Sequence, residues 1–309
     1  SRATPQMRFE ILDAAGTRIL AEKERLGTLL SREEGKTLPE GIGEAARAGQ
    51  IFKFFAGEAL RIGGETMPSV RPGVGVEITR EGVGVVGLIT PWNFPIAIPA
   101  WKIAPALAYG NTVVFKPADL VPGCAHAIAK ILDDAGIPAG VFNLVMGRGS
   151  VVGEAMVGSP DVNAISFTGS VPTGRRIALA CAESGKKLQM EMGGKNPMVV
   201  LDDADLDTAV TSAVNGAFFS TGQRCTASSR LIVTEGIHDR FVDAVVARLK
   251  GLVVDDALKQ GTHIGPVVDA AQMEQDERSP AIRRDQAGAN LRFAGERPHR
   301  ETPRLYPQP

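Results

Sequence analysis

Near the amino terminus, apolar residues recur with the period of a helix. In residues 5–35, leucine and isoleucine fall about 3.6 residues apart with charged side chains between them, which predicts one amphipathic helix that ends at Gly35. Residues 39–61 repeat this pattern after Pro39 and predict a second helix. A Gly- and Pro-rich stretch at 62–82 surrounds one short Val/Ile strand. The chain therefore begins with a largely helical segment.

From residue 83 onward, short apolar runs alternate with amphipathic segments. The apolar runs predict strands at 83–90, 111–116, 141–146, 164–168, 187–192, 197–201 and 230–234. The segments between them predict helices at 99–109, 122–135, from about 150, from 170 to about 184, 202–221 and 237–252. This alternation is typical of a doubly wound parallel sheet, so the predicted fold class is α/β.

The strand pattern also suggests where the chain divides. A length of 309 residues favours about two domains, at roughly 150 residues each. The strand at 187–192 runs into Gly193-Gly194 before a new strand begins, so we assign residues 1–192 to one domain and 193–309 to a second. After about residue 270 the apolar pattern weakens, and arginine, acids and proline replace large hydrophobic residues.

Composition and charge narrow the class of protein. Hydrophobic residues make up 44% and charged residues 22%, which is typical of a globular protein with a core. The net charge of −1 gives no sign of a nucleic-acid or membrane surface, and no apolar run approaches the ~18 residues of a membrane span. The three cysteines form no short-spaced pair, so we expect a reducing, cytoplasmic compartment.

Polar residues follow the ends of several predicted strands. Asn93 comes after the first core strand, Lys116 ends the next, and Glu191 lies at the end of the strand 187–192. Because parallel strands end at one edge of a sheet, where ligands of open α/β folds bind, these residues are expected to converge on one site. Taken alone, Glu191 is explained more simply as a solvated acid at a strand end.

The three cysteines fall in different contexts. Cys124 and Cys181 lie in helical patterns, where a small buried side chain is expected, whereas Cys225 lies in a polar turn before a strand. Such a turn suits an exposed nucleophile, and a Cys–His thiol hydrolase is the second chemistry it allows. The histidines show no informative arrangement with it; they are His126, His238, His263 and His299.

Two glycine-containing segments are candidates for binding an anion. Residues 82–87 match GxGxxG, but these glycines precede and enter a strand, so we interpret the match as chance. Residues 167–170 form a better strand–Gly–Ser–helix turn, in which Ser170 can cap the helix and Gly169 allows close approach to a phosphate, although such turns also occur for structural reasons alone. No metal-ligand spacing is present, so no metal site is expected.

Taken together, five segments of the chain resemble the aldehyde dehydrogenase superfamily. They are ITPWNFP (89–95), VVFKPAD (113–119), ISFTGS (165–170), LQMEMGGKNP (188–197) and FFSTGQRC (218–225). Their order and spacing also resemble the family, from about residue 5 to 269 and more weakly to the end. The resemblance implies that residues 1–192 bind a nicotinamide cofactor and that 193–309 form part of a catalytic domain.

The resemblance implies a role for each matching catalytic residue. Cys225 would attack the aldehyde carbon, and the Asn93 amide and the Cys225 N–H would hold the resulting oxyanion. Oxidation by NAD or NADP would leave a thioester, which Glu191 would hydrolyse by activating water. The implied activity is NAD(P)-dependent oxidation of an aldehyde to a carboxylate. A thiol esterase that uses the same residues and a non-catalytic remnant are the alternatives.

The resemblance also implies a cofactor site. Lys116 would contact the adenosine ribose, and the implied cofactor residues further include Asp119, Ser170, Gly169, Thr168, Trp92, Ile89, Pro91 and Gly193. Many family members have glutamate where Asp119 stands. The longer acid would favour the ribose 2′-hydroxyl and repel a 2′-phosphate, so the shorter one leaves the choice between NAD and NADP open.

Substrate and assembly are implied less directly. The overall pattern is most similar to bacterial semialdehyde dehydrogenases, including 2-oxoglutarate-semialdehyde types, while Trp101 stands where succinate-semialdehyde members share an arginine. Arg224, beside the nucleophile, is a hypothetical partner for a substrate carboxylate. Compared with the family, the chain is expected to be truncated at both ends, and a full-length form is expected to be a homodimer or homotetramer that takes a small-molecule aldehyde.

Overall fold

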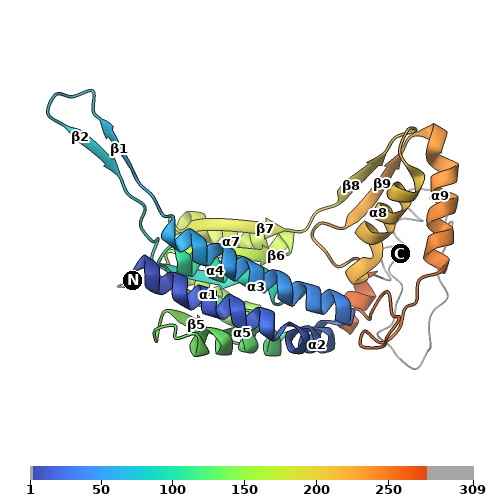
Figure 1. The fold of residues 1–309 in the computed structure, drawn as a ribbon, viewed down its shortest axis with the longest axis horizontal. Coiled ribbons are helices and arrows are strands. Elements are labelled where there is room, and N and C mark those ends of the chain that lie inside the picture. The colour runs from blue at the N-terminus through green and yellow to red at the C-terminus, as the bar shows by residue number, and fades with distance from the viewer. Residues whose placement is uncertain (1–2, 277–309) are drawn as a thin grey trace. The chain divides into compact units, whose positions relative to one another are not determined.

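A computed structural model describes residues 3–276, and the contacts within it divide the chain into two compact units. The first unit contains Ser1–Leu26 and Ile42–Glu191; the second contains Gly27–Gly41 and the chain from Met192 onward. Figure 1 labels many of the elements of both, and each unit is described by itself. The weak apolar pattern predicted after residue 270 falls mainly on residues 277–309, which lie outside the described part.

The amino-terminal helices differ from the prediction at one point. The single helix expected over 5–35 is two helices, α1 (Pro5–Ala21) and α2 (Lys23–Glu34), and the second predicted helix is α3 (Leu38–Leu60). Glu22 leaves the helical conformation with φ −103° and ψ 14°, and its carboxylate accepts hydrogen bonds from Arg18 and Arg25 on either side. The break leaves the apolar period almost in phase, which is why the pattern alone did not reveal it.

The stretch at 62–82 contains two strands where one was expected. β1 (Glu65–Pro68) and β2 (Gly75–Ile78) pair antiparallel, with Glu65 opposite Ile78. Nearly all residues of this hairpin are exposed, so neither strand carries the alternation of apolar and polar residues that marks a half-buried strand.

A five-stranded sheet forms the centre of the first unit. Its strands are β3 (Val85–Ile89), β4 (Thr112–Lys116), β5 (Phe142–Leu144), β6 (Ala164–Gly169) and β7 (Lys187–Met192), in the spatial order β5-β4-β3-β6-β7. β3 pairs in parallel with β4 and β6, and β4 with β5. The predicted α/β class and parallel sheet are therefore confirmed.

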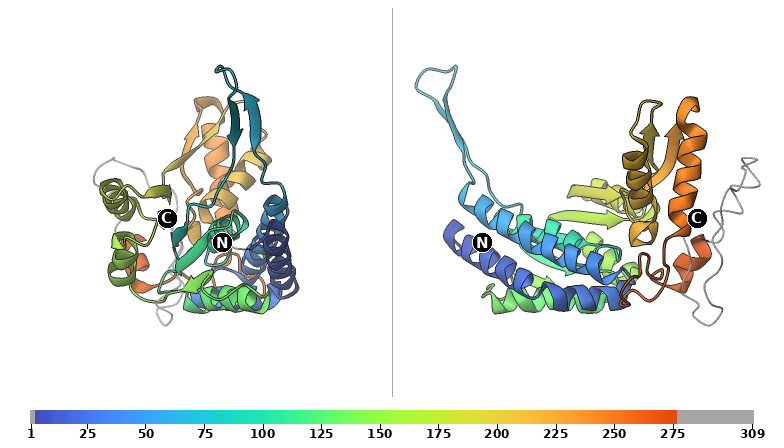
Figure 2. Two further views of the ribbon diagram at one scale, coloured as in Figure 1. Left: turned by 90° about the vertical axis from the view of Figure 1, so that its left-hand side faces the viewer. Right: turned by 45° about the vertical axis from the view of Figure 1, so that its right-hand side comes forward.

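Helices lie on both faces of this sheet (Figure 2). They are α4 (Ala97–Ala108), α5 (Pro122–Asp134), α6 (Glu154–Gly158), which follows a π-helical turn η1 (Gly149–Gly153), and α7 (Val171–Glu183). α4 packs against β3 and β4, and α7 packs against β6 and α6. The central strands bury Leu88, Phe115 and Phe167, which accounts for their near-continuous apolar sequence.

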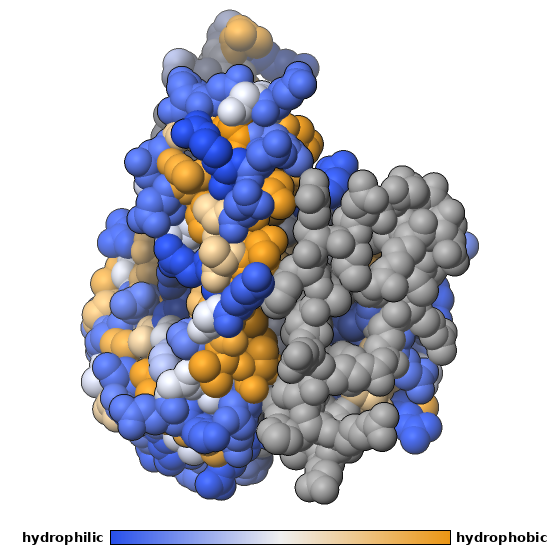
Figure 3. Space-filling view, turned by 90° about the vertical axis from the view of Figure 1, so that its right-hand side faces the viewer, coloured by the Kyte–Doolittle hydropathy of each residue, from blue (hydrophilic) through white to orange (hydrophobic). Residues whose placement is uncertain are grey.

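The second unit is built on a smaller parallel pair of strands. β8 (Asn196–Val200) pairs with β9 (Ser228–Val233), and the helices are α8 (Leu206–Phe218), the short 3₁₀ segment η2 (Phe219–Gly222) and α9 (Glu235–Lys250). Val200, Val214 and Phe241 belong to the core between the strands and the helices. Figure 3 shows a face on which hydrophobic residues lie among hydrophilic ones on the described surface.

The segment Gly27–Gly41 joins the second unit through specific contacts. The Leu38 amide donates to the Ala257 carbonyl at 3.0 Å, and a Cβ on Gly35 would lie only 2.5 Å from the Pro266 carbonyl oxygen. Gly35, at φ +94°, ends α2 as the sequence predicts and also allows this close approach. No helix in the described part of the chain is long and apolar enough to cross a membrane.

Candidate active site

The carboxyl ends of the central strands form one edge of the first unit. Ile89 is paired with Lys116 on one side and with Phe167 on the other, so β3, β4 and β6 end at the same level. After β3, the chain forms β4 and then β5 on one side of β3, and then forms β6 on the other side. The edge between β3 and β6 is thus a topological switch point, where ligands of open α/β sheets bind.

The glycines at 82–87 take no part in this edge. Gly82 and Gly84 precede β3, and Gly87 lies inside it, where a Cβ would come within 2.7 Å of the Met156 sulfur. These positions leave no helix amino terminus beside the glycines, which confirms the interpretation of the GxGxxG match as chance.

The loop that carries Asn93 is anchored near both of its ends. It follows β3, and the Thr90 amide donates to the Lys116 carbonyl at 3.2 Å. At its far end the buried carboxylate of Glu44 accepts hydrogen bonds from the amides of Ile96 and Ala97, at 2.9 and 3.0 Å, and so caps the start of α4. Asn93 is half-buried, as are Pro91 and Trp92 on the same loop.

Lys116 ends β4 in a buried position. Burial lowers the pKa of its ammonium group, while the nearby charge of Asp119 acts in the opposite direction. A Cβ on Gly149 would lie 3.9 Å from the Lys116 Nζ, so the turn after β5 passes close to the amine without a side chain between them. Asp119 itself is exposed. A basic group and a glycine turn at a sheet edge suit the polar part of a nucleotide.

The turn between β6 and α7 brings Thr168, Gly169 and Ser170 to the same edge. A Cβ on Gly169 would meet the Phe167 ring at 2.6 Å, so this position has no room for a side chain. Ser170 occupies the N-cap position of α7, but the prediction that its side chain caps the helix is wrong. Its hydroxyl donates instead to the Thr173 hydroxyl oxygen at 2.9 Å, within the first turn of the helix.

Glu191 is exposed near the end of β7 and is linked to a buried lysine that the sequence analysis missed. Gln189 Nε2 donates to Glu191 at 3.4 Å, and the Gln189 amide oxygen accepts a hydrogen bond from Lys102 Nζ at 2.9 Å. Lys102 also donates to Ser166 Oγ at 2.7 Å. Burial lowers its pKa to about 8, against the opposing effect of the Glu191 charge. The available signal was a lone lysine within the apolar run 95–109.

In the second unit, Cys225 lies in the turn between η2 and β9. It is exposed, whereas Cys124 and Cys181 are buried, which confirms their predicted burial. Burial raises the pKa of the Cys181 thiol. The Cys225 backbone is held by Asn196 on β8, whose side-chain Nδ2 donates to the Cys225 carbonyl at 2.6 Å and to the Ala227 carbonyl at 3.2 Å. Of the three thiols, Cys225 alone is both accessible and held in a turn.

Arg224, next to the cysteine, is engaged by the protein itself. Its Nη2 lies 3.2 Å from a carboxylate oxygen of Glu40 and donates to Ser220 Oγ at 3.0 Å. Only 27% of its side chain is exposed. One side of the guanidinium is therefore held by Glu40 and Ser220, and the hypothesis that Arg224 binds a substrate carboxylate stays a prediction.

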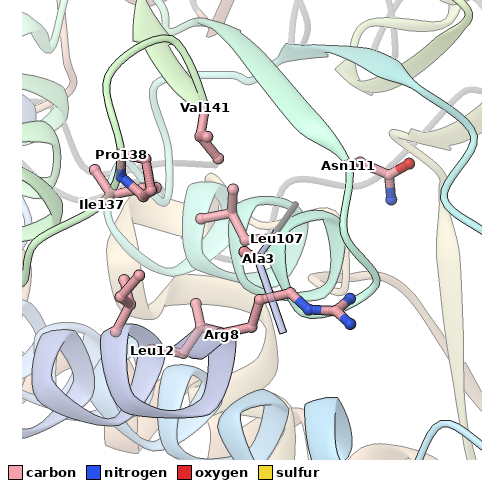
Figure 4. A pocket seen from close by; sticks show the side chains of 9 residues that line it. Ala3, Arg8, Leu12, Leu107, Asn111, Ile137, Pro138 and Val141 are labelled. Carbon is pink, nitrogen blue, oxygen red and sulfur yellow. The ribbon is translucent and has the colours of Figure 1, made fainter. Parts of the chain in front are cut away.

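The predicted site residues therefore fall into two groups. Cys225 and Gly193 belong to the second unit, and the other predicted site residues belong to the first, where Ile89, Lys116 and Thr168 share one edge. A small apolar pocket in the first unit, lined by Arg8, Leu12 and Leu107 among others, contains none of them (Figure 4). Within residues 3–276, no cluster of His, Cys, Asp and Glu has the composition of a metal site.

A switch-point edge with a buried lysine and a glycine turn, together with an accessible cysteine in a second unit, fits the family that the sequence resembles. The chain belongs to the Aldehyde dehydrogenase family, which it matches over residues 1–309.

Individual relatives agree with this assignment. Alpha-ketoglutaric semialdehyde dehydrogenase of Bacillus subtilis is 47% identical over 275 residues, covering 89% of this chain and 56% of the relative. A crystal structure of betaine aldehyde dehydrogenase from Staphylococcus aureus in complex with NAD⁺ is 36% identical, with a TM-score of 0.96 over 100% of this chain and 61% of that one. The structure of an E. coli NADP dependent enzyme is 37% identical, with a TM-score of 0.94 and coverages of 100% and 63%. The chain thus spans little more than half the length of the curated relative.

Proposed function

We propose that this chain takes part in the NAD(P)-dependent oxidation of an aldehyde to a carboxylate. The observation that carries the proposal is the exposed Cys225 thiol, which lies in a turn held by Asn196, in a member of the Aldehyde dehydrogenase family. A thiolate is the form of cysteine that attacks a carbonyl carbon, and such attack needs a thiol that a substrate can reach.

The first step is addition of the Cys225 thiolate to the aldehyde carbon. A carbon–sulfur bond forms and the carbonyl oxygen becomes an oxyanion. The side-chain amide of Asn93 and the backbone N–H of Cys225 are the proposed donors to that oxygen. The anchoring of the Asn93 loop by Glu44 supports this role, because a donor stabilises an oxyanion best when its position is fixed in advance.

The residues at the switch-point edge fit a nicotinamide cofactor. We assign the ribose to Lys116 with Asp119, and the pyrophosphate to the turn at Gly169 and Ser170, where a Cβ at 169 has no room. Trp92, Thr168 and Gly193 are assigned to the nicotinamide side, and Ile89 and Pro91 to the cofactor site as a whole. A nicotinamide held there would supply the acceptor for the hydride that leaves the thiohemiacetal carbon, so that the oxyanion re-forms a carbonyl and a thioester remains on Cys225. The chain is about equally similar to a relative whose structure contains NAD⁺ and to one described as NADP dependent, so NAD and NADP are both proposed as cofactors.

Glu191 is the proposed base for the last step. Water adds to the thioester carbon, its proton passes to the Glu191 carboxylate, and the carbon–sulfur bond breaks to release the carboxylate product and the Cys225 thiol. The hydrogen-bonded chain from Glu191 through Gln189 to Lys102 supports this assignment, since it links the carboxylate to a buried amine whose pKa is about 8.

A semialdehyde that carries a carboxylate, such as 2-oxoglutarate semialdehyde, is the proposed substrate. The support is the 47% identity to the Bacillus subtilis enzyme. We further propose that residues 1–192 act as the cofactor-binding domain and 193–309 as part of the catalytic domain, in a cytoplasmic protein whose full-length form is a homodimer or homotetramer.

Thiol esterase activity is the second candidate, because the exposed Cys225 and Glu191 need no cofactor to hydrolyse an activated ester. Three measurements separate the candidates. Aldehyde-dependent appearance of reduced-nicotinamide absorbance supports the dehydrogenase. Ester turnover that is unaffected by cofactor, without reduced cofactor, supports the esterase. Absence of both, with Cys225 no more reactive toward iodoacetamide than a free thiol, supports a non-catalytic remnant.

A further inference from the structure

Glu40, near the start of α3, uses its two carboxylate oxygens on different parts of the second unit. Oε2 accepts hydrogen bonds from the Thr37 amide at 3.2 Å and from the Thr37 hydroxyl at 2.8 Å. Oε1 accepts from the Ser220 amide at 2.8 Å, from the Ser220 hydroxyl at 3.0 Å and from Arg224 Nη2 at 3.2 Å. Glu40 and the residues it contacts on Oε1 are separated by about 180 positions in the sequence, so the contact is a tertiary one.

The Oε2 contacts have a familiar explanation. Thr37 precedes α3 and Glu40 is its third residue, so the carboxylate that reaches back to the Thr37 amide forms one half of a capping box. A residue with only this role would leave the other carboxylate oxygen in solvent. Here the other oxygen takes three hydrogen bonds from the segment that leads into Cys225.

That segment has a strained backbone. Ser220 and Thr221 both have φ of 52°, in the left-handed region that non-glycine residues rarely adopt, and both side chains are buried. Among the described residues these are the only non-glycine positions with positive φ. Such strain persists only where neighbouring groups hold it, and it gathers at functional sites. Glu40 accepts hydrogen bonds from Ser220, where the strained backbone begins, and from the side chain of Arg224, which directly precedes Cys225.

We propose that Glu40 is a positioning residue for Cys225: its Oε1 holds the strained backbone at Ser220 and the Arg224 side chain, in the segment that leads into Cys225. The catalytic meaning of this role rests on the proposed function, but the structural role does not. Because Glu40 touches neither the thiol nor any predicted cofactor residue in the described contacts, it acts on the reaction only through the turn.

The test compares Glu40→Ala with two matched variants of the full chain. Thr37→Ala removes the hydroxyl on the capping side and leaves the contacts of Oε1 in place. Glu58→Ala removes another α3 glutamate, one that also pairs with an arginine, Arg61, but lies away from the turn. Hydrogen exchange is followed in peptides that cover 219–226, because the Ser220 amide is itself bonded to Glu40.

Glu40→Ala is expected to speed exchange in 219–226 by at least about tenfold, since hydrogen bonds to a charged acceptor are lost. Where the chain oxidises an aldehyde, kcat is expected to fall at least about tenfold with KM within about threefold, because the nucleophile loses its fixed position. Both controls are expected to stay close to the parent protein. Unchanged exchange in peptides that cover α9, which belongs to the same unit as Glu40, shows that the variant is folded. Equal effects from Glu40→Ala and Thr37→Ala would overturn the proposal, because Glu40 would then act only as a cap.

Ser220→Gly gives a second test that does not depend on one variant folding well. Glycine adopts positive φ with little strain, so the turn depends less on Glu40 in this background. The effect of Glu40→Ala on exchange is therefore expected to be at least about threefold smaller with Ser220→Gly than without it. Additive effects would show that Glu40 does not act through Ser220 and would overturn the proposal. If no aldehyde is oxidised, the proposed function fails, while the exchange measurements still decide the role of Glu40.

Discussion

The three cysteines of this chain have the same functional group, but only the thiol of Cys225 is accessible. If Cys225 is the nucleophile, Cys225→Ala should lower the rate of reduced-nicotinamide formation by about 10³-fold or more, as expected when a covalent catalyst is removed. The matched control is Cys181→Ala, which should lower the melting temperature by opening a small cavity and leave kcat within about twofold. Comparable loss of turnover in both variants would contradict the assignment.

Glu191 is assigned to the hydrolytic step alone, and this makes a separate prediction. Glu191→Gln should slow thioester hydrolysis by about 10²- to 10⁴-fold, the usual contribution of a general base. The first turnover does not need that base, so rapid mixing should still show a burst of about one reduced cofactor per active site. Loss of the burst together with the steady state would show that Glu191 acts earlier than hydrolysis.

For single residues, the sequence was sufficient to predict which cysteine is exposed, but it was not sufficient to predict the partner of Arg224. A polar turn distinguishes Cys225 from two cysteines in apolar helical patterns, and burial follows from that local pattern. Adjacency to Cys225 suggested that Arg224 faces a substrate. Its real partner, Glu40, lies 184 positions away, and no local pattern can reveal such a contact.

Among the elements, α4, β6 and β7 share the buried Lys102, whose pKa falls from 10.5 to about 8 through burial. Below pH 8 the folded and unfolded states both carry the proton, and the cost of burying the charge is fully present. Between pH 8 and 10.5 the folded state releases its proton first, so stability rises with pH. Relative to Lys102→Met, the parent protein should gain up to about 3 kcal/mol across this range.

Paired thermal melts of the parent protein and Lys102→Met at pH 8 and pH 10.5 measure this gain. Groups that titrate in both proteins cancel in the difference between the two melting temperatures. The difference should move by several degrees in favour of the parent protein as the pH rises. A difference that does not change with pH would show that Lys102 is not desolvated in the folded state.

The turn between β6 and α7 makes a prediction about a backbone position. In Gly169→Ala the new Cβ would meet the buried Phe167 ring, so the turn must shift, at a cost of about 1–3 kcal/mol. If the turn holds the pyrophosphate, the Kd for NAD(P)⁺ should rise by about tenfold or more, since backbone amides lose their alignment. Gly43→Ala, where no atom lies near the added methyl, should leave that Kd unchanged in the same fluorescence titration.

Most elements were predictable because each central strand is buried on both faces and each helix on one, which gives them distinct apolar periods. Two features were missed because neither one changes the apolar pattern of the sequence. Glu22 interrupts a helix without shifting its apolar phase, and the exposed hairpin at 65–78 has no buried face to produce a pattern. Ser170 likewise stands at a helix start as expected, but its hydroxyl prefers Thr173, a choice that only side-chain geometry decides.

At the scale of the whole molecule, the division into two units depends on contacts that the sequence does not display. Gly27–Gly41 belongs to the second unit because of Leu38, Gly35 and Glu40, which contact residues 180 to 231 positions further along the chain. Local patterns predict α3 and the helical conformation of α2, but they do not show which unit each end of a helix joins. The ends of β3 and β4 do lie at one level, with Ile89 paired to Lys116, because the register of parallel strands fixes that edge by itself.

Because the candidate cofactor residues other than Gly193 lie in the first unit and the candidate nucleophile lies in the second, their functions should be separable by mutation. Lys116→Met, which removes the buried amine beside Gly149, should raise the Kd for NAD(P)⁺ by about tenfold or more, because a charged contact is lost. The same variant should leave cofactor-free ester hydrolysis by Cys225 within about threefold of the parent rate. Cys225→Ala should do the reverse, abolishing ester hydrolysis and leaving the Kd within about twofold. Fluorescence titration measures the Kd for NAD(P)⁺ and an ester assay measures hydrolysis by Cys225, each on both variants. Parallel loss of both functions in either variant would contradict an independent cofactor site in the first unit.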